Sequence, residues 1–181
     1  MSKERAMTTI KQLRIQARLR VEEGAVTAGY SADRSAVLKQ LNAALATELI
    51  CVLRYRRHHF MARGLNARST ADEFLTHSNE ELGHADKLAA RIVQLGGEPD
   101  YSPDSLTDRS HAEYVTGTTL IDMINEDLVA ERIAIDSYRE LIQSLGDRDP
   151  TTSDLLKMIL AVEEKHADEL SDLLAGQKLE H

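Results

Sequence analysis

The chain has 181 residues, the length of one ordinary domain. It carries 30 Asp and Glu against 22 Lys and Arg, and the formal net charge of −8 argues against nucleic-acid binding by bulk charge. Its one cysteine, Cys51, excludes a disulfide framework and a four-cysteine metal site, and favours a cytoplasmic location. No apolar run approaches the ~20 residues of a membrane helix, so we expect no membrane association.

The N-terminal segment differs from the rest of the chain in charge. Residues 1–20 carry a net charge of +5, from six Lys and Arg against Glu4. Apolar residues recur at helical spacing within a short amphipathic helix expected over residues 7–21. We therefore separate residues 1–30 as a basic amphipathic extension. Its apolar positions favour packing on a neighbouring subunit, and contact with DNA phosphates is the alternative.

Apolar residues three and four positions apart predict four long helices, over about residues 32–62, 69–95, 118–145 and 150–174. Ser69 or Thr70 is expected to cap the second helix. Asp149 is expected to cap the fourth, with Pro150 at its first position. These signals predict an all-α protein.

The connections between these helices differ in length. The first pair is joined around Gly64 and the last pair around Gly146, so each pair is expected to form an antiparallel hairpin. Residues 97–117, between the second and third helices, are long enough to cross a bundle. We predict a four-helix bundle with one long crossover between helices two and three, plus a short N-terminal helix. The bundle domain is expected to span residues 31–177, and residues 178–181 to be the remnant of a polyhistidine tag.

A Glu-x-x-His motif occurs twice. Glu81 and His84 form the first copy and Glu163 and His166 the second, and each copy is followed by Ala-Asp. Residues at i and i+3 lie on one face of a helix, so both side chains can bind one metal ion. A single copy is weak evidence, whereas two copies in related positions predict a metal site.

Each motif has a matching glutamate upstream. Glu48 precedes the first motif and Glu131 precedes the second, at nearly the same separation along the chain. Both fall among apolar residues that should face the core. Tyr55 and Tyr138 follow these glutamates by about two helical turns. Each tyrosine is therefore expected nearly above its own glutamate.

Four glutamates inside one bundle would repel one another or take up protons, whereas two divalent cations would balance their charge. Carboxylate and imidazole ligands without thiolate favour iron or manganese over structural zinc. Glu81 and Glu163 are the expected bridging ligands, with Glu48 and Glu131 terminal. Solvated helix faces with i,i+3 pairs are the alternative, which the duplication disfavours. The predicted ligands are Glu48, Glu81, His84, Glu131, Glu163 and His166.

This pattern resembles the ferritin-like di-iron family over about residues 33–174, most closely bacterioferritins and Dps-like miniferritins with a bacterioferritin-type site. The resemblance implies a ferroxidase centre that oxidises Fe(II) with O₂ or H₂O₂ using two iron ions per subunit. It also implies a hollow homo-oligomeric shell that stores the ferric mineral and protects against oxidative stress. Tyr55 matches a tyrosine next to the ligands and is included among the catalytic residues. Asp127 matches an acid that orients a ligating histidine.

Three departures from that family carry expectations of their own. Bacterioferritins bind haem through a Met directly after the second-helix ligand, and here that position is Leu82, so no haem is expected. A fifth helix is missing after Gln177, and about 30 residues precede the bundle. The last two departures favour a dodecamer over a 24-mer, with a mass of about 240 kDa from 12 subunits of 20.2 kDa.

Two other functions remain open from the sequence. One is a rubrerythrin-like di-iron peroxidase, whose usual Cys₄ iron domain is absent here. The other is a Dps-like DNA-protecting shell in which iron chemistry is secondary. The sequence leaves open the choice between iron and manganese and between O₂ and H₂O₂.

Some titratable residues near the motifs have simpler interpretations. Cys51 is expected to be a small buried hydrophobe. His77 and Glu80 are expected at solvated or interface positions, with an iron-entry role as the alternative. The basic residues 54–59 are expected to complement the dipole at the end of the first bundle helix.

Overall fold

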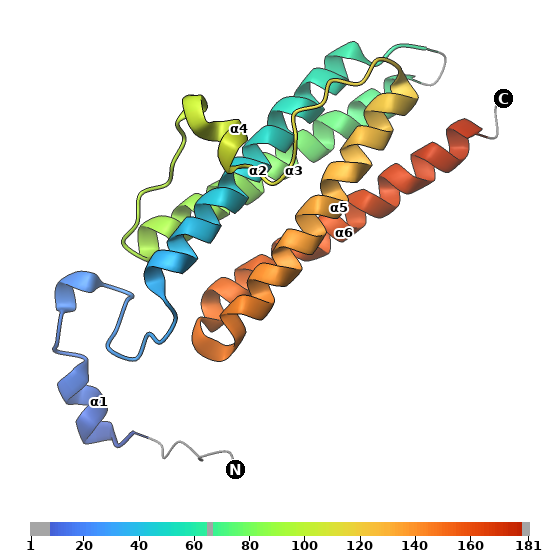
Figure 1. Cartoon of the computed structure of the whole chain (residues 1–181). Coiled ribbons are helices and arrows are strands. Elements are labelled where there is room, and N and C mark those ends of the chain that lie inside the picture. Colours follow the sequence, from blue (N-terminus) through green and yellow to red (C-terminus); the bar gives the residue numbers. More distant parts are fainter. Residues whose placement is uncertain (1–7, 65–66, 179–181) are drawn as a thin grey trace.

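The computed structural model describes residues 8–64 and 67–178, and within them four long helices form a bundle (Figure 1). The bundle helices are α2 (Arg34–Met61), α3 (Ala67–Gln94), α5 (Leu120–Leu145) and α6 (Pro150–Lys178). The described residues contain no strand. The predicted all-α bundle is therefore confirmed.

Capping side chains fix where most of these helices begin. The Asp33 side chain accepts a hydrogen bond from the Ala36 amide at the start of α2. Asp149 Oδ1 accepts from the Thr152 amide at 3.0 Å, and Pro150 is the first residue of α6, as predicted. At the start of α5, Thr119 forms a reciprocal capping box with the third residue of the helix.

The start of α3 differs from the prediction. The helix begins at Ala67, so Ser69 and Thr70 lie inside its first turn rather than before it. The chain already turns at Gly64, which has a φ of 129° and whose carbonyl accepts a hydrogen bond from the Ala67 amide. Thr70 is buried in this turn.

The helices pair as two hairpins, α2 with α3 and α5 with α6, and a long crossover joins them (Figure 1). The crossover contains two short helices that were not predicted, η2 (Pro103–Ser105) and α4 (Leu106–Arg109). It is tied to α2 by Asn42, which donates to the Glu98 carbonyl, and by Thr47, which accepts from the His111 amide at 2.9 Å. The connection is thus a fixed layer over α2.

Two apolar clusters fill the bundle and leave a polar level between them. One cluster contains Leu45 of α2 and Leu88 of α3, and the other contains Tyr55 of α2 and Phe74 of α3. Burying each such side chain contributes about 1.5–3 kcal/mol. On every bundle helix, the predicted ligand positions fall between the two clusters.

The helix α2 is the one described helix that is long and apolar enough to cross a membrane by composition. Half of its most apolar window is buried inside the bundle, and it carries Glu48 and Arg54 as buried side chains. It is therefore the core helix of the bundle.

The end of the N-terminal extension packs on the bundle: Val26 belongs to the apolar cluster of Leu45 and Leu88, and Tyr30 donates a hydrogen bond to Asp149 Oδ2 at 2.9 Å. The part before it, residues 8–23, projects away from the bundle (Figure 1). It contains α1 (Ile10–Gln16) and η1 (Val21–Glu23), so the predicted helix is shorter than expected and Leu19 lies outside it. The apolar side chains of Ile10 and Leu13 are 68% and 53% exposed. Their partner is therefore not in the described part of this chain. The expected tag remnant lies outside the described residues except for Lys178, the last residue of α6.

Candidate metal centre

Six acidic and imidazole side chains meet at the polar level of the bundle. Each is at most 2% exposed, and they come from all four long helices: Glu48 of α2, Glu81 and His84 of α3, Glu131 of α5, Glu163 and His166 of α6. The i,i+3 spacing places Glu and His of each motif on the same inner face. The structure thus brings together all six residues singled out by the sequence.

The possible ligand atoms fall into two overlapping groups. Atoms of Glu48 and His84 lie within 4.8 Å of one another and of atoms from Glu81 and Glu163. Atoms of Glu131 and His166 form a second such group with the same two glutamates. Glu81 and Glu163 are common to both groups, which is the arrangement that two bridged cations require.

The donor atoms themselves indicate that a cation belongs here. Five buried atoms of these residues have no partner in hydrogen-bonding geometry: Glu81 Oε1, Glu131 Oε2, both carboxylate oxygens of Glu163, and His166 Nδ1. The close contacts of Glu81 Oε1 and the Glu163 oxygens are with the Nδ1 atoms of His84 and His166, 2.9–3.4 Å away, so these atoms meet only other members of the cluster. Buried polar atoms in proteins are nearly always paired, because leaving one unpaired costs about 1–3 kcal/mol. Carboxylate oxygens and an imidazole nitrogen are ligands that divalent iron or manganese prefers. The residues present therefore fit a two-metal site.

Burial changes the protonation of the terminal glutamates. It raises the pKa of Glu48 to about 8, and the neighbouring charge of Glu81 adds to the effect. Burial also raises the pKa of Glu131 well above its usual value, with the charges of Glu81 and Glu163 as further causes. Without a cation, Glu48 holds a proton at neutral pH, and the raised pKa of Glu131 favours its protonated form as well.

The two histidines are shifted by the carboxylates around them. Burial disfavours the charge on His84, but the carboxylates of Glu163, Glu48 and Glu81, whose oxygens lie 2.9, 3.5 and 3.1 Å from Nδ1, outweigh it and raise the pKa of His84 to about 12. The pKa of His166 rises to about 11 for the same reason. Protons thus balance the cation-free centre, and metal binding must displace them.

The tyrosines cross between the two hairpins. Tyr55 of α2 donates a hydrogen bond to Glu131 of α5, and Tyr138 of α5 donates to Glu48 of α2. Each tyrosine follows the glutamate of its own helix by seven residues, which span about 10.5 Å along a helix and are too far for a hydrogen bond between the two. The facing helix instead brings the partner to the same level. Each tyrosine fixes one terminal carboxylate.

Asp127 has a different role from the one that the resemblance implies. Its carboxylate accepts from Arg54 Nε at 2.8 Å and lies 2.8 Å from His58 Nδ1, both on α2. Arg54 and His58 also bond to the carbonyls of Glu113 and Thr116. Asp127 thus joins α5, α2 and the crossover, and two of the basic residues expected at a helix dipole are buried in this network.

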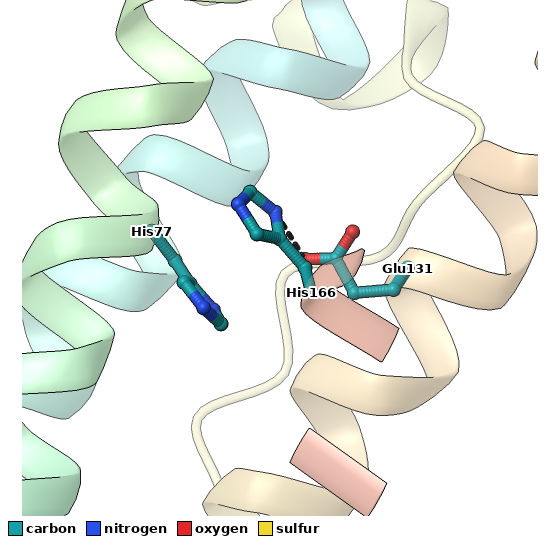
Figure 2. Close-up of side chains that lie close together, drawn as sticks. All are labelled: His77, Glu131 and His166. Carbon is teal, nitrogen blue, oxygen red and sulfur yellow. Dashed lines mark ion pairs between the residues drawn. The ribbon is translucent and has the colours of Figure 1, made fainter. Parts of the chain in front are cut away.

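Two residues beside the centre were expected at solvated or interface positions. Glu80 Oε2 lies 2.6 Å from His166 Nε2, so Glu80 orients the imidazole that directs Nδ1 to the centre. His77 is fully buried and stacks on His166 with the ring centroids 4.0 Å apart (Figure 2). The sequence contained one indication that His77 is buried: it lies one helical turn before Glu81, on the same face of the helix. Cys51 is buried as predicted, and burial raises the pKa of its thiol.

Comparisons with known proteins agree with this geometry. A model of the ferritin-like domain family matches residues 38–179. A bacterioferritin of Desulfovibrio desulfuricans is 28% identical over 141 residues, covering 77% of this chain and 75% of the relative. A nutrient stress-induced DNA-binding protein of Nostoc sp. is 32% identical over 155 residues, covering 81% of this chain and 83% of the relative.

Solved structures share the fold. The bacterioferritin-related protein from Bacteroides fragilis, described as a dodecameric thioferritin, superposes with a TM-score of 0.78 at 32% identity. The match covers 81% of this chain and 88% of that one. Dps from Thermosynechococcus elongatus superposes with a TM-score of 0.74 at 22% identity, over 77% of this chain and 90% of that one.

Proposed function

The chain belongs to the ferritin-like domain family, and we propose that its buried centre is a ferroxidase site that binds two Fe(II) ions per subunit and oxidises them. The observation that carries this proposal is the pair of buried ligand groups that share Glu81 and Glu163 and contain five atoms without a partner in hydrogen-bonding geometry. Fe(II) is the substrate, and it supplies the electrons that reduce O₂ or H₂O₂.

The residues of the centre would bind the two ions as shared or as terminal ligands. Glu81 and Glu163 lie where each can contact both ions, whereas Glu48 and Glu131 each serve one. His84 and His166 complete the two groups. Four carboxylates balance two divalent cations, so the filled centre is neutral in the protein interior once its protons have left.

Neighbouring hydroxyl and carboxylate groups keep the ligands in place. Tyr55 and Tyr138 each hold one oxygen of a terminal glutamate, so the other oxygen of each would serve as the ligand of an ion. Glu80 holds His166 Nε2 and thereby fixes its tautomer. We include Tyr55 with the six ligands as a residue on which the reaction depends.

We further propose that the subunits form a homo-oligomeric cage that stores the ferric product and limits damage by Fe(II) and peroxide. The exposed apolar residues of α1 need a covering surface, which a neighbouring subunit would supply. We expect twelve subunits per cage, which at 20.2 kDa each gives a total mass of about 240 kDa. The dodecameric relative from Bacteroides fragilis supports that number. With its single cysteine, the protein suits the reducing cytoplasm.

DNA protection is the second candidate function. It is favoured by the basic residues of the N-terminal extension, by the position of residues 8–23 away from the bundle, and by the DNA-binding relative from Nostoc sp.. Such binding would be electrostatic and would weaken steeply with salt. Iron oxidation and DNA contact would use separate parts of the chain.

Stopped-flow oxidation of Fe(II) tests the ferroxidase proposal. The Glu81→Ala/Glu163→Ala variant should lose the fast phase, because both bridging carboxylates are gone. Glu164→Gln is the matched control, since Glu164 is a neighbouring exposed carboxylate paired with Arg139 on the outer surface. Unchanged kinetics in the double variant would reject the assignment.

A further inference from the structure

A second cluster of possible ligands lies beside the proposed centre. Glu73 and His77 are one turn apart on α3, and Glu169 reaches them from α6. His77 Nε2 is 3.3 Å from Glu73 Oε1 and 3.0 Å from Glu169 Oε2, and ligand atoms of the three residues lie within 4.8 Å of one another. The glutamate side chains are 36% and 34% exposed, so the cluster is open to solvent.

His77 connects this outer cluster with the centre. Its side chain is fully buried, and its Nδ1 has no hydrogen-bond partner. It also offers a ring nitrogen within 4.8 Å of ligand atoms of Glu131 and His166, and Figure 2 shows the three side chains together. An imidazole that served packing alone would be expected to have both nitrogens paired.

We propose that Glu73, His77 and Glu169 bind a third divalent cation, outside the two assigned to the centre. Two carboxylates and one imidazole supply hard oxygen and nitrogen ligands with a charge that a divalent cation balances. The identity of that cation as Fe(II) rests on the proposed function, because the site then holds substrate at the solvent side of the centre. His77 contacts both places and links them.

A lysine side chain lies beside the carboxylates of this cluster and neutralises part of their negative charge. Lys165 Nζ lies 3.3 Å from Glu169 Oε1 and 3.7 Å from Glu80 Oε2. Its side chain is 51% exposed, so it can turn toward solvent when a cation enters. A lysine in this position balances the carboxylates of the empty site.

Equilibrium dialysis with Co(II) under anaerobic conditions tests the proposal, because Co(II) accepts the same ligands and resists oxidation. The intact protein should bind one more Co(II) per subunit than the Glu73→Gln/Glu169→Gln variant. The matched control is Asp72→Asn/Asp172→Asn, which removes two exposed carboxylates from the same helices, close to the cluster in sequence. The control should bind as much as the intact protein. Equal binding by the Gln variant and the intact protein would overturn the proposal.

A second variant separates this site from the proposed centre. Glu81→Ala/Glu163→Ala should lose the two central ions and keep the outer one. If the intact protein binds a single Co(II) that only Glu73→Gln/Glu169→Gln removes, the outer site stands and the two-metal centre fails. Anomalous scattering from Co(II)-soaked crystals of the intact protein gives a readout without any substitution. A peak among Glu73, His77 and Glu169 is expected, and its absence would overturn the proposal.

Discussion

Binding of two divalent cations to the centre should release at least three protons per subunit at pH 7. The groups that lose them are His84 and His166, with pKa values of about 12 and 11, and Glu48, with a pKa of about 8. Each of the three holds a proton at pH 7 without metal, and none can keep it as a ligand; burial also raises the pKa of Glu131, which adds to the release.

The pH dependence identifies the contribution of Glu48. Its pKa is raised, so the carboxyl is protonated below about pH 8 and ionised above it. Proton release should therefore fall by about one proton between pH 7 and pH 9. In Glu48→Gln, which keeps the shape of the protonated acid, this fall should be absent if the remaining ligands hold both ions.

Anaerobic titration with Co(II) in weakly buffered solution, followed with a pH indicator, measures this release without oxidation. The Asp72→Asn/Asp172→Asn variant is the control for the loss of surface carboxylates. Release of one proton or fewer at pH 7, or the same pH dependence in Glu48→Gln and the intact protein, would refute the assigned protonation of the centre.

Asp127→Ala should lower the free energy of unfolding by about 3–5 kcal/mol, measured by chemical denaturation, because it leaves the buried Arg54 without its carboxylate; a loss below about 1 kcal/mol would contradict this role. Deleting residues 1–24 should reduce the number of subunits per particle, obtained as the mass from light scattering divided by the mass of the shortened subunit, and an unchanged number would exclude α1 as an intersubunit contact. The intact protein should have the mass of twelve subunits of 20.2 kDa each, and twice that mass would indicate a 24-mer. The purified protein should show no Soret absorption, because Leu82 has no lone pair for haem iron, and a stoichiometric band would contradict the expectation.

The sequence predicted the bundle because its signals are local. Apolar spacing marked the helices, and Asp149 with Pro150 marked the start of α6 correctly. The six side chains of the centre could be found because the Glu-x-x-His motif occurs twice and each copy has an upstream glutamate. The start of α3 was missed because the turn at Gly64 allowed the helix to begin before the expected cap.

The relations between helices were harder to predict. Spacing along α2 gives the position of Tyr55 along the bundle axis. It does not give the residue that faces Tyr55, which is Glu131 of α5. His77 lies one turn before Glu81 on the inner face of α3, but that spacing does not show that α6 brings His166 and Glu169 against it. Asp127 was assigned to a histidine ligand, although Arg54 and His58 of α2 are its partners.

Anomalous diffraction at the iron edge, from crystals soaked anaerobically with Fe(II), tests the central claim most directly. Two peaks per subunit are predicted at the polar level of the bundle, each in contact with Glu81 and Glu163. One peak should also contact Glu48 and His84, and the other Glu131 and His166. A single peak, or no iron among these side chains, would contradict the two-metal ferroxidase centre.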